Sequence, residues 1–289
     1  MDWRPACSLD ALRARAALLR EVREFFHRRG VLEVQTSVLA AATVTEPAVE
    51  SLTVPGLGYL QTSPEYQMKR LLAAGAPSHY QLGPVFRAGE AGRRHNPEFV
   101  MLEWYRLGFT DAELMAEVAA LVDLALGPAP TRTLTYREVL ERAAADPVET
   151  RLTPREALDL RISAGLDALG AGRFFVTDYP ADQAALARLR PGDESVAARF
   201  ELVVDGLELA NGYWELGDPD ALRSRFAADL EQRRCQGQRQ PEPDERFLAA
   251  MNSGLPPCAG VALGFDRLLM LKLGVASLEE VMAFPIDRA

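Results

Sequence analysis

Hydrophobic residues recur at steps of three and four positions along several segments of the chain, and this spacing predicts amphipathic helices. Ser8 and Thr110 precede two of these segments and are suited to cap the first helical turn. Helices are predicted over residues 8–30, 63–75, 110–127, 218–236, 244–253 and after Gly264.

Other segments alternate apolar and polar residues, which is typical of strands with one buried face. "HYQLGPVFR" and "PEFVMLEWYRLGF" flank the loop "AGEAGRRHN", and "ARFELVVDG" and "LELANGYWEL" form a second pair. Because the strands come in consecutive pairs, the sequence predicts an α+β fold with a mostly antiparallel sheet flanked by helices. A doubly wound fold is not expected, and neither GxxxxGK[ST] nor a strand–GxGxxG–helix unit is present.

One domain is predicted over 1–289, with a small, mainly helical insertion at about 131–195. In that segment, "TYREVLERAA" and "TPREALDL" each begin with Thr and place Glu three residues later, which is the signature of a helix start. A strand is expected at "RFFVTDYP".

Composition narrows the class of protein. The net charge is −9, so a broad surface for nucleic acid is not expected. The N-terminus has no apolar signal segment and no apolar run has transmembrane length, so we expect a cytoplasmic protein. The scattered cysteines and histidines favour neither a disulfide framework nor a zinc site. Lysine occurs only at Lys69 and Lys272, so phosphate binding would rely on arginine.

Arg87 stands at the end of an apolar strand, where its guanidinium can clamp a phosphate or pair with a nearby glutamate. On the strand that follows, Glu103 and Tyr105 share one face. A carboxylate beside a phenol suits an ammonium ligand, and a cross-strand ion pair with arginine is the alternative.

Glu208 and Glu215 fall on opposite faces of a regular strand. A bulge at the intervening Asn211–Gly212 pair would re-aim one of them, so that both acids could hold Mg²⁺. Two solvated acids on an exposed hairpin are the alternative.

Gly260 and Gly264 allow a ligand to approach the backbone, and Arg267 falls in the first turn of the helix that follows. The start of a helix favours phosphate, although an Asp–Arg pair at a plain cap would give the same pattern.

In this order and spacing, the three stretches resemble the class II aminoacyl-tRNA synthetases. "FR" with its loop and strand resembles motif 2, "GVALGFDRLLML" motif 3, and "RGVLEVQTSVL" motif 1, with Ser37 in place of the usual proline. "SPEYQMKRLL", "HNPEF" and "ELANGYWEL" resemble the lysyl branch, but the motif 1 helix begins at about residue 8, without room for an anticodon-binding barrel. Together with Ser63 and Ala262, which replace alanine and glycine, this resembles the stand-alone elongation factor P–(R)-β-lysine ligases.

The resemblance implies an ATP- and Mg²⁺-dependent ligase that forms an acyl-adenylate of β-lysine and transfers it to a lysine of elongation factor P. It implies a homodimer, with tRNA an improbable substrate. Arg87 and Arg267 would be catalytic, and Glu208 and Glu215 would hold Mg²⁺. The implied ATP-binding residues are Arg87, Ala88, Gly89, Glu90, Asn96, Glu208, Leu209, Gly264 and Arg267. The implied amino-acid pocket is Ser63, Pro64, Glu65, Glu103, Tyr105, Asn211, Tyr213, Glu215 and Ala262.

One departure concerns adenine. The synthetases carry a Glu two residues after the motif 2 arginine, whereas this chain has Gly89 there and Glu90 next. Either Glu90 or backbone groups would then contact adenine. Three rival functions stay open: a truncated lysyl-tRNA synthetase that charges tRNA, a regulatory paralogue without catalysis, and an enzyme that forms an amide on a free amino acid.

Overall fold

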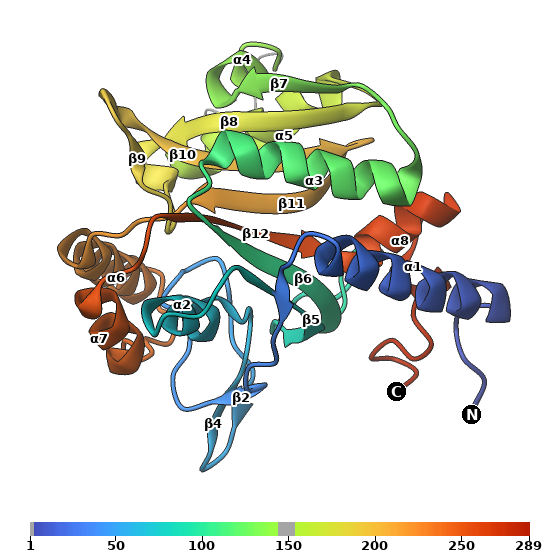
Figure 1. Cartoon of the computed structure of the whole chain (residues 1–289), viewed down its shortest axis with the longest axis horizontal. Coiled ribbons are helices and arrows are strands. Elements are labelled where there is room, and N and C mark those ends of the chain that lie inside the picture. The colour runs from blue at the N-terminus through green and yellow to red at the C-terminus, as the bar shows by residue number, and fades with distance from the viewer. Residues whose placement is uncertain (1–2, 144–153) are drawn as a thin grey trace.

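The computed structural model describes residues 3–143 and 154–289, arranged around one large twisted sheet (Figure 1). The path through this sheet is β1-β5-β6-β12-β11-β10-β8-β7, with β9 paired to β10. The central pairs from β5 to β8 are antiparallel, while β1–β5 and β7–β8 are parallel. Its strands are β1 Leu32–Glu33, β5 His79–Phe86, β6 Glu98–Leu107, β12 Cys258–Gly264, β11 Leu207–Trp214, β10 Asp193–Val204, β8 Arg173–Pro180, β7 Thr131–Thr135 and β9 Leu189–Arg190.

Three helices cover one face of the sheet: α1 Leu9–His27, α3 Asp111–Leu126 and α8 Phe265–Leu273 (Figure 1). Their apolar sides pack on the inward residues of the central strands, such as Leu102 and Trp104 of β6, which are fully buried. The predicted caps are confirmed, because Ser8 accepts a hydrogen bond from the Ala11 amide and Thr110 forms a capping box with Glu113.

The other helices lie at one flank. Tyr66 of α2 stacks on Phe247 of α7 at 4.2 Å between ring centroids, and Phe226 of α6 joins the same apolar cluster. A small three-stranded sheet projects below α2 (Figure 1). These elements are α2 Glu65–Ala73, α6 Pro219–Cys235, α7 Glu245–Ser253, β2 Leu39–Ala40, β3 Thr53–Val54 and β4 Gly58–Leu60.

The segment 131–195 is built differently from the mainly helical insertion that its composition suggests. The helices α4 Tyr136–Leu140 and α5 Pro154–Ala168 are present, and Thr135 caps α4 through the predicted box with Glu138. However, β7, β8 and β9 extend the main sheet, and β7 pairs in parallel with β8. The apolar sides of α4 and α5 pack on these strands, so the segment continues the domain. The predicted cap Thr153 lies outside the described residues.

The two chain ends lie near each other, beyond α1 (Figure 1). The amides of Ala6 and Cys7 donate to the carbonyls of Ala283 and Met282, after the short 3₁₀ helix η3 Leu278–Glu280. All three cysteines carry free thiols. Among the helices of the described residues, none combines the length and apolarity that a bilayer crossing requires.

Candidate active site

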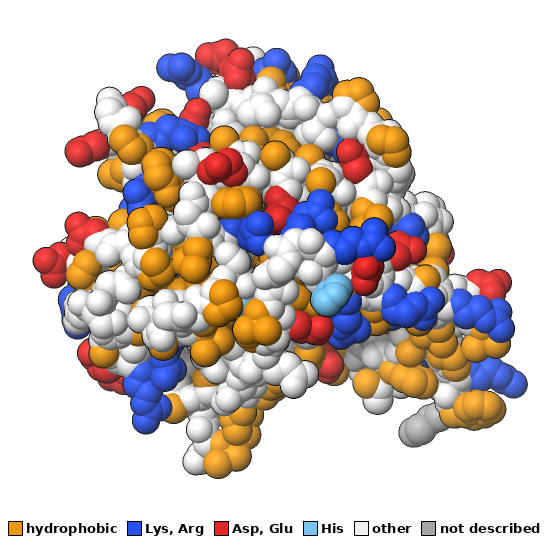
Figure 2. All heavy atoms as spheres, viewed as in Figure 1, with side chains coloured by type: hydrophobic (Ala, Val, Ile, Leu, Met, Phe, Trp, Pro, Cys, Tyr) orange, Lys and Arg blue, Asp and Glu red, His pale blue; other side chains and the backbone are white. Residues whose placement is uncertain are grey.

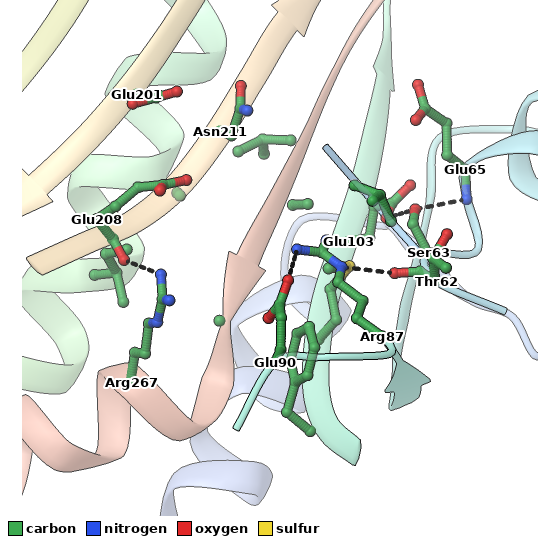
Figure 3. A pocket seen from close by; sticks show the side chains of 18 of the residues that line it. Thr62, Ser63, Glu65, Arg87, Glu90, Glu103, Glu201, Glu208, Asn211 and Arg267 are labelled. Atoms are coloured by element: carbon green, nitrogen blue, oxygen red, sulfur yellow. Dashed lines mark hydrogen bonds and ion pairs between the residues drawn. The ribbon is translucent and has the colours of Figure 1, made fainter. Parts of the chain in front are cut away.

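A pocket lies on the face of the sheet opposite α1 and α8, and both arginines singled out from the sequence line it (Figure 3). Arg87 follows the last residue of β5, and Arg267 belongs to the first turn of α8. They reach the pocket from distant parts of the chain because β12, which leads into α8, pairs with β6, and β6 pairs with β5.

The strand register sets the pocket floor in two rows. Across β6, β12, β11 and β10, Glu103 pairs with Ala262, Ala262 with Asn211, and Asn211 with Glu201. Since side chains directly opposite each other on one face are about 5 Å apart, these four are near neighbours. The next row contains Tyr105, Gly260, Tyr213 and Arg199.

A bulge re-aims Glu208, but it does not lie where the sequence suggested. The register between β10 and β11 shifts at Leu209, while Asn211 and Gly212 pair regularly. Gly212 is instead required by packing, because a Cβ there would come 2.3 Å from the Phe200 ring. The extra residue brings Glu208 into phase with Asn211, and both line the pocket.

The two arginines are held by few strong contacts. Arg87 Nη1 lies 3.4 Å from Glu90 Oε1, and its Nε lies 3.4 Å from the Thr62 carbonyl oxygen. Arg267 donates to the Glu208 carbonyl at 2.8 Å, and its Nη2 lies 2.8 Å from His95 Nε2. Neither guanidinium forms a close pair with a carboxylate, so both retain donors for an anion.

The acids around the pocket fall into two groups. Glu208 lies beside Arg267, at the end of the pocket that we call the arginine end, and Glu201 lies on the same side of the pocket but farther from Arg267 (Figure 3). Glu215 belongs to the other end, because its Oε2 lies 2.6 Å from the buried ammonium of Lys69. The structure therefore separates the Glu208–Glu215 pair and places Glu201 beside Glu208 instead. Glu201, which the sequence analysis missed, precedes Glu208 in the same β10–β11 hairpin.

The opposite end is buried and lined by acids, and we call it the carboxylate end. Glu103, 2% exposed, accepts hydrogen bonds from Ser63 Oγ at 2.7 Å and from the Tyr105 hydroxyl at 2.8 Å. Burial, and next the negative charge of Glu65, raise the pKa of the Glu103 carboxyl. The predicted pairing of Glu103 with Tyr105 on one face of β6 is present.

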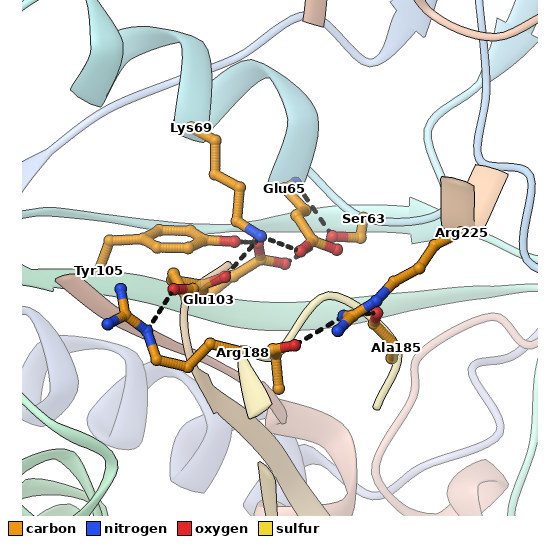
Figure 4. A network of polar contacts seen from close by, with 10 residues as sticks. Ser63, Glu65, Lys69, Glu103, Tyr105, Ala185, Arg188 and Arg225 are labelled. Carbon is orange, nitrogen blue, oxygen red and sulfur yellow. Dashed lines mark hydrogen bonds and ion pairs between the residues drawn. The ribbon is translucent and has the colours of Figure 1, made fainter. Parts of the chain in front are cut away.

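The ammonium of Lys69 lies between the two other acids of this end, Glu65 and Glu215, and pairs with both (Figure 4). Its ammonium lies 2.6 Å from Glu65 Oε1 and 2.6 Å from Glu215 Oε2, and its side chain is 1% exposed. The sequence analysis noted Lys69 only as one of two lysines. Its position four residues after Glu65 on a helix was the available signal.

At the carboxylate end, Asn211 Oδ1 and Glu215 Oε1 have no hydrogen-bond partner, and Glu215 Oε2 has only the ion pair with Lys69. Gly260 makes room for this end, since a Cβ there would come 2.3 Å from the Tyr105 ring and 2.6 Å from Glu215 Oε1. A buried acceptor without a donor costs free energy, so the geometry favours a ligand that brings N–H groups.

Most of the predicted site residues line this one pocket, with exceptions that the structure explains. Pro64, Ala88 and Gly89 lie outside its lining. Asn96 lines it, yet its Nδ2 donates to the Glu98 carbonyl and its Oδ1 accepts from the Ile286 amide. The predicted residues in the lining are Ser63, Glu65, Arg87, Glu90, Asn96, Glu103, Tyr105, Glu208, Leu209, Asn211, Tyr213, Glu215, Ala262, Gly264 and Arg267.

Ser37 and Gly89, which depart from the synthetase pattern, have structural reasons. The Ser37 amide donates to Gln67 Oε1 at 2.9 Å, and Gln67 Nε2 donates back to the Ser37 carbonyl. Proline has no N–H and could not make the first of these bonds. Gly89 has φ +78°, a conformation that a residue with a side chain rarely adopts.

Comparison with known proteins identifies the family of this chain. The model of the family "tRNA synthetases class II (D, K and N)" matches residues 1–288. The chain belongs to this class II synthetase family. It is 43% identical to a protein named elongation factor P–(R)-β-lysine ligase in Vibrio cholerae, over 100% of this chain and 99% of that protein. Relatives with the same name in Vibrio vulnificus and Proteus mirabilis are each 42% identical over 100% of this chain.

Membership of the class II family confirms the fold expected from the sequence, a helix-flanked and mostly antiparallel sheet. The relatives are named as ligases and align with nearly their whole length. The resemblance to this branch of the synthetase family, carried by motif 2, motif 3 and the "ELANG" strand, is confirmed as well.

Proposed function

We propose that this chain activates (R)-β-lysine with ATP and transfers the acyl group to a lysine side chain of elongation factor P. The observation that carries the proposal is the division of one pocket into an arginine end and a carboxylate end. One end suits a triphosphate and the other suits a substrate with two ammonium groups. The names of the relatives, which align over the full chain, support the same substrate and acceptor.

In the first step, an oxygen of the substrate carboxylate attacks the α-phosphorus of ATP. The bond between the α-phosphorus and the bridging oxygen breaks, and pyrophosphate leaves. Arg87 lies between the two ends, where its guanidinium can bind both the reacting carboxylate and the α-phosphate. Arg267 extends from the start of α8 and stabilises negative charge on the phosphates. No side chain acts as a nucleophile, so catalysis rests on positioning and electrostatics.

In the second step, the neutral amine of the acceptor lysine attacks the acyl carbon. The bond from that carbon to the AMP oxygen breaks, an amide forms, and the amine nitrogen loses a proton. The arginine end is the side from which the acceptor would enter, because the carboxylate end is closed by buried residues such as Lys69 and Glu215.

Glu201 and Glu208 would hold Mg²⁺, with ATP oxygens and water completing its shell. In the described residues, no cluster of three or more His, Cys, Asp or Glu could hold a metal unaided. Two carboxylates fit Mg²⁺ that arrives with a nucleotide, since this ion usually keeps several waters and phosphate oxygens. The ion would supply positive charge at the phosphates. Glu215 lies at the other end of the pocket, where it pairs with Lys69. Glu201 pairs with Arg199, so a bound Mg²⁺ would compete with this guanidinium for the carboxylate.

The carboxylate end would select the substrate through its placed acceptors. Ala262 lies directly between Glu103 and Asn211 in the register, so its methyl group occupies the space between them. Ser63 occupies one oxygen of Glu103. Both features limit where an amine can bind, and a polar site rejects a misplaced amine because its buried acceptors stay unpaired.

We further propose that the enzyme acts as a cytoplasmic homodimer through the segment that resembles motif 1. Leu32 and Leu39 of this segment are 50% and 39% exposed, and Leu57 on the adjoining β3–β4 hairpin is 66% exposed. Hydrophobic side chains gather on the projecting hairpin at the bottom of Figure 2. Such a patch is typical of a surface that another protein covers.

The proposed function is tested by incubating the protein with ATP, Mg²⁺ and labelled (R)-β-lysine, with either purified elongation factor P or total tRNA as acceptor. We expect label on elongation factor P and none on tRNA. Label on tRNA would favour the rival reading as a lysyl-tRNA synthetase. Label on neither, with no pyrophosphate exchange, would favour a paralogue without catalysis.

A further inference from the structure

Lys69 is the least accessible cation of the pocket region, and neither reaction step uses it. It extends from α2 towards the end of β11, and its ammonium is enclosed by protein (Figure 4). Burying an ammonium group is costly unless carboxylates surround it. Two do so at 2.6 Å, from Glu65 and Glu215, and they raise the pKa of Lys69 against the effect of burial.

The choice of lysine is informative in a chain whose other cations are almost all arginine. The sequence has only two lysines among 32 basic residues. A guanidinium is a wide planar fork, whereas an ammonium is a compact point charge that fits between two carboxylates. The Tyr105 ring, 5.9 Å from the Lys69 ammonium, limits the space on one side.

The charges at the carboxylate end can be counted. Glu65, Glu103 and Glu215 bring three negative charges when ionised, and Lys69 brings one positive charge, which leaves two negative charges among these four side chains. Arg188 lies outside the pocket lining and donates to the backbone carbonyl of Glu215, so it is not part of this count. A bound β-lysine has two ammonium groups there, because its carboxylate is directed to Arg87. The remaining charge of the pocket thus equals the charge of the diammonium part of the substrate.

We propose that Lys69 is a positioning residue that determines substrate charge: it holds the carboxylates of Glu65 and Glu215 in place and offsets one of their charges, which leaves the pocket two negative charges for a diammonium ligand. This inference rests on the proposed function and adds to it. Lys69 would not touch the substrate. It would act through the two carboxylates, since one oxygen of Glu215 is held by Lys69 while Oε1 stays without a hydrogen-bond partner.

Other groups around Lys69 bear on its effect. Arg188 Nε donates to the Glu215 carbonyl at 3.0 Å and adds positive charge near Glu215. The Cys258 thiol faces the same cluster, and burial raises its pKa to about 12, so it stays neutral. The titratable or charged groups facing this cluster are Glu65 of α2, Glu103 and Tyr105 of β6, Arg188 before β9, Glu215 after β11, and Cys258 of β12.

The test uses calorimetric binding of (R)-β-lysine and, separately, of ATP to the intact protein between pH 6 and 8.5. Lys69→Met removes the charge at similar length, and Lys69→Arg keeps it. Lys272→Met is the matched control, because Lys272 lies on α8 and donates to the Ala125 carbonyl away from the pocket. The double variant Lys69→Met/Glu65→Gln removes the cation together with one of the two acids that it pairs with. It replaces the single variant in the test if Lys69→Met does not fold.

We expect Lys69→Met to weaken β-lysine binding at pH 7 by at least about tenfold and ATP binding by less than about threefold. Burial raises the pKa of the Glu215 carboxyl and Lys69 opposes that rise, so without the cation Glu215 is less ionised at pH 7. Raising the pH ionises Glu215, and the loss of binding shrinks towards pH 8.5. The double variant shows the same rise with pH because Glu215 still lacks its cation. Lys272→Met follows the wild-type profile. Lys69→Arg keeps the wild-type dependence on pH, because the charge remains, but it binds β-lysine more weakly at every pH because the wide guanidinium displaces the two carboxylates.

A merely structural role predicts equal losses of ATP and β-lysine binding with an unchanged pH profile, and that result would overturn the inference. So would wild-type affinity in Lys69→Met, or a flat profile in the double variant. A wild-type protein that binds neither β-lysine nor lysine contradicts the proposed function itself. The two failures are therefore distinguishable.

Discussion

The groups that would bind the phosphates and those of the carboxylate end line one pocket but are prepared for their ligands in different ways. Arg87, between the two ends, makes only contacts of 3.4 Å and its side chain is 26% exposed. At the carboxylate end, the ionisable groups are buried and linked, with contacts of 2.6 to 2.8 Å among Glu65, Lys69, Glu103 and Glu215 and their partners. Arg87 is loosely held until phosphate arrives, while the carboxylate end is fixed before the substrate binds.

This difference indicates that the two ends have different roles, one in the rate of the reaction and the other in substrate recognition. Charge on a triphosphate changes during the reaction, so groups that engage it most strongly in the transition state raise the rate. Amine recognition requires acceptors that stay where they are, because specificity depends on leaving them unpaired when the wrong substrate binds. Substitutions at the arginine end should therefore lower kcat, and those at the carboxylate end should alter substrate preference.

The largest expected effect is at the arginine end. Arg87→Ala and Arg267→Ala should each lower ATP–pyrophosphate exchange by roughly 10³-fold or more, because a preorganised charge on the phosphates is lost. The melting temperature should change little, since neither guanidinium closely pairs with a carboxylate. Arg13→Ala is the control, because Arg13 is 76% exposed and pairs with Asp10. Near-normal exchange in either variant would refute the phosphate role.

The next largest effect concerns the residues that bind Mg²⁺, because substitutions at the two ends of the pocket should differ in their effect on the metal. Glu201→Gln should raise the Mg²⁺ concentration for half-maximal exchange by about tenfold or more, because one of two carboxylate ligands is lost. Glu215→Gln should leave that concentration unchanged and raise the KM for the amino acid. A titration of exchange against Mg²⁺ checks both. If Glu215→Gln raised the Mg²⁺ requirement and Glu201→Gln did not, Glu208 and Glu215 would be the metal ligands, as the resemblance implied.

A smaller change is expected from Ala262→Gly. Removing this methyl group widens the gap between Glu103 and Asn211, so activity with α-lysine should increase relative to β-lysine by about tenfold, the scale of one methyl group in a pocket. The measurement is the ratio of kcat/KM values for the two isomers. An unchanged ratio would remove the proposed basis of isomer choice.

The smallest effect concerns pH. Amine binding needs an ionised Glu103, and its raised pKa means that affinity for the amino acid should increase as the pH rises through that value. The Ser63 hydroxyl donates to the ionised carboxylate and lowers the pKa. Ser63→Ala should thus move the rise to higher pH, by less than about one unit. A profile identical to wild type would show that Glu103 does not set the pH dependence.

Local patterns of apolar and polar residues were sufficient to predict most of the helices and strands. The alternation along β6 correctly placed Glu103 and Tyr105 on one face, which lines the pocket, while Leu102 and Trp104 of the other face lie in the core. The parallel pairing of β7 with β8 was not predicted, because these strands are separated by two helices. Periodicity within a short segment gives no information on pairing between strands that are distant in the sequence.

The site residues that belong to sequence motifs could be predicted, whereas those that depend on the three-dimensional arrangement could not. The re-aiming of Glu208 was anticipated, but glycine was taken as the sign of a bulge, whereas Gly212 is needed to accommodate Phe200. Glu201 was missed because its proximity to Glu208 depends on the register of a hairpin. Lys69 was missed because its importance comes from Glu215, which is close in the fold and 146 positions away in the sequence.

The most direct test of the two-ended pocket is ATP–pyrophosphate exchange by the wild-type protein with three amino acids. These are (R)-β-lysine, α-lysine, and 3-aminohexanoic acid, which lacks the terminal ammonium of β-lysine. Exchange should be fastest with (R)-β-lysine, slower with α-lysine, and close to background with the monoamine, because unneutralised acids would stay buried. Equal exchange with the monoamine, or none with any of the three, would contradict a pocket that joins a triphosphate to a diammonium substrate.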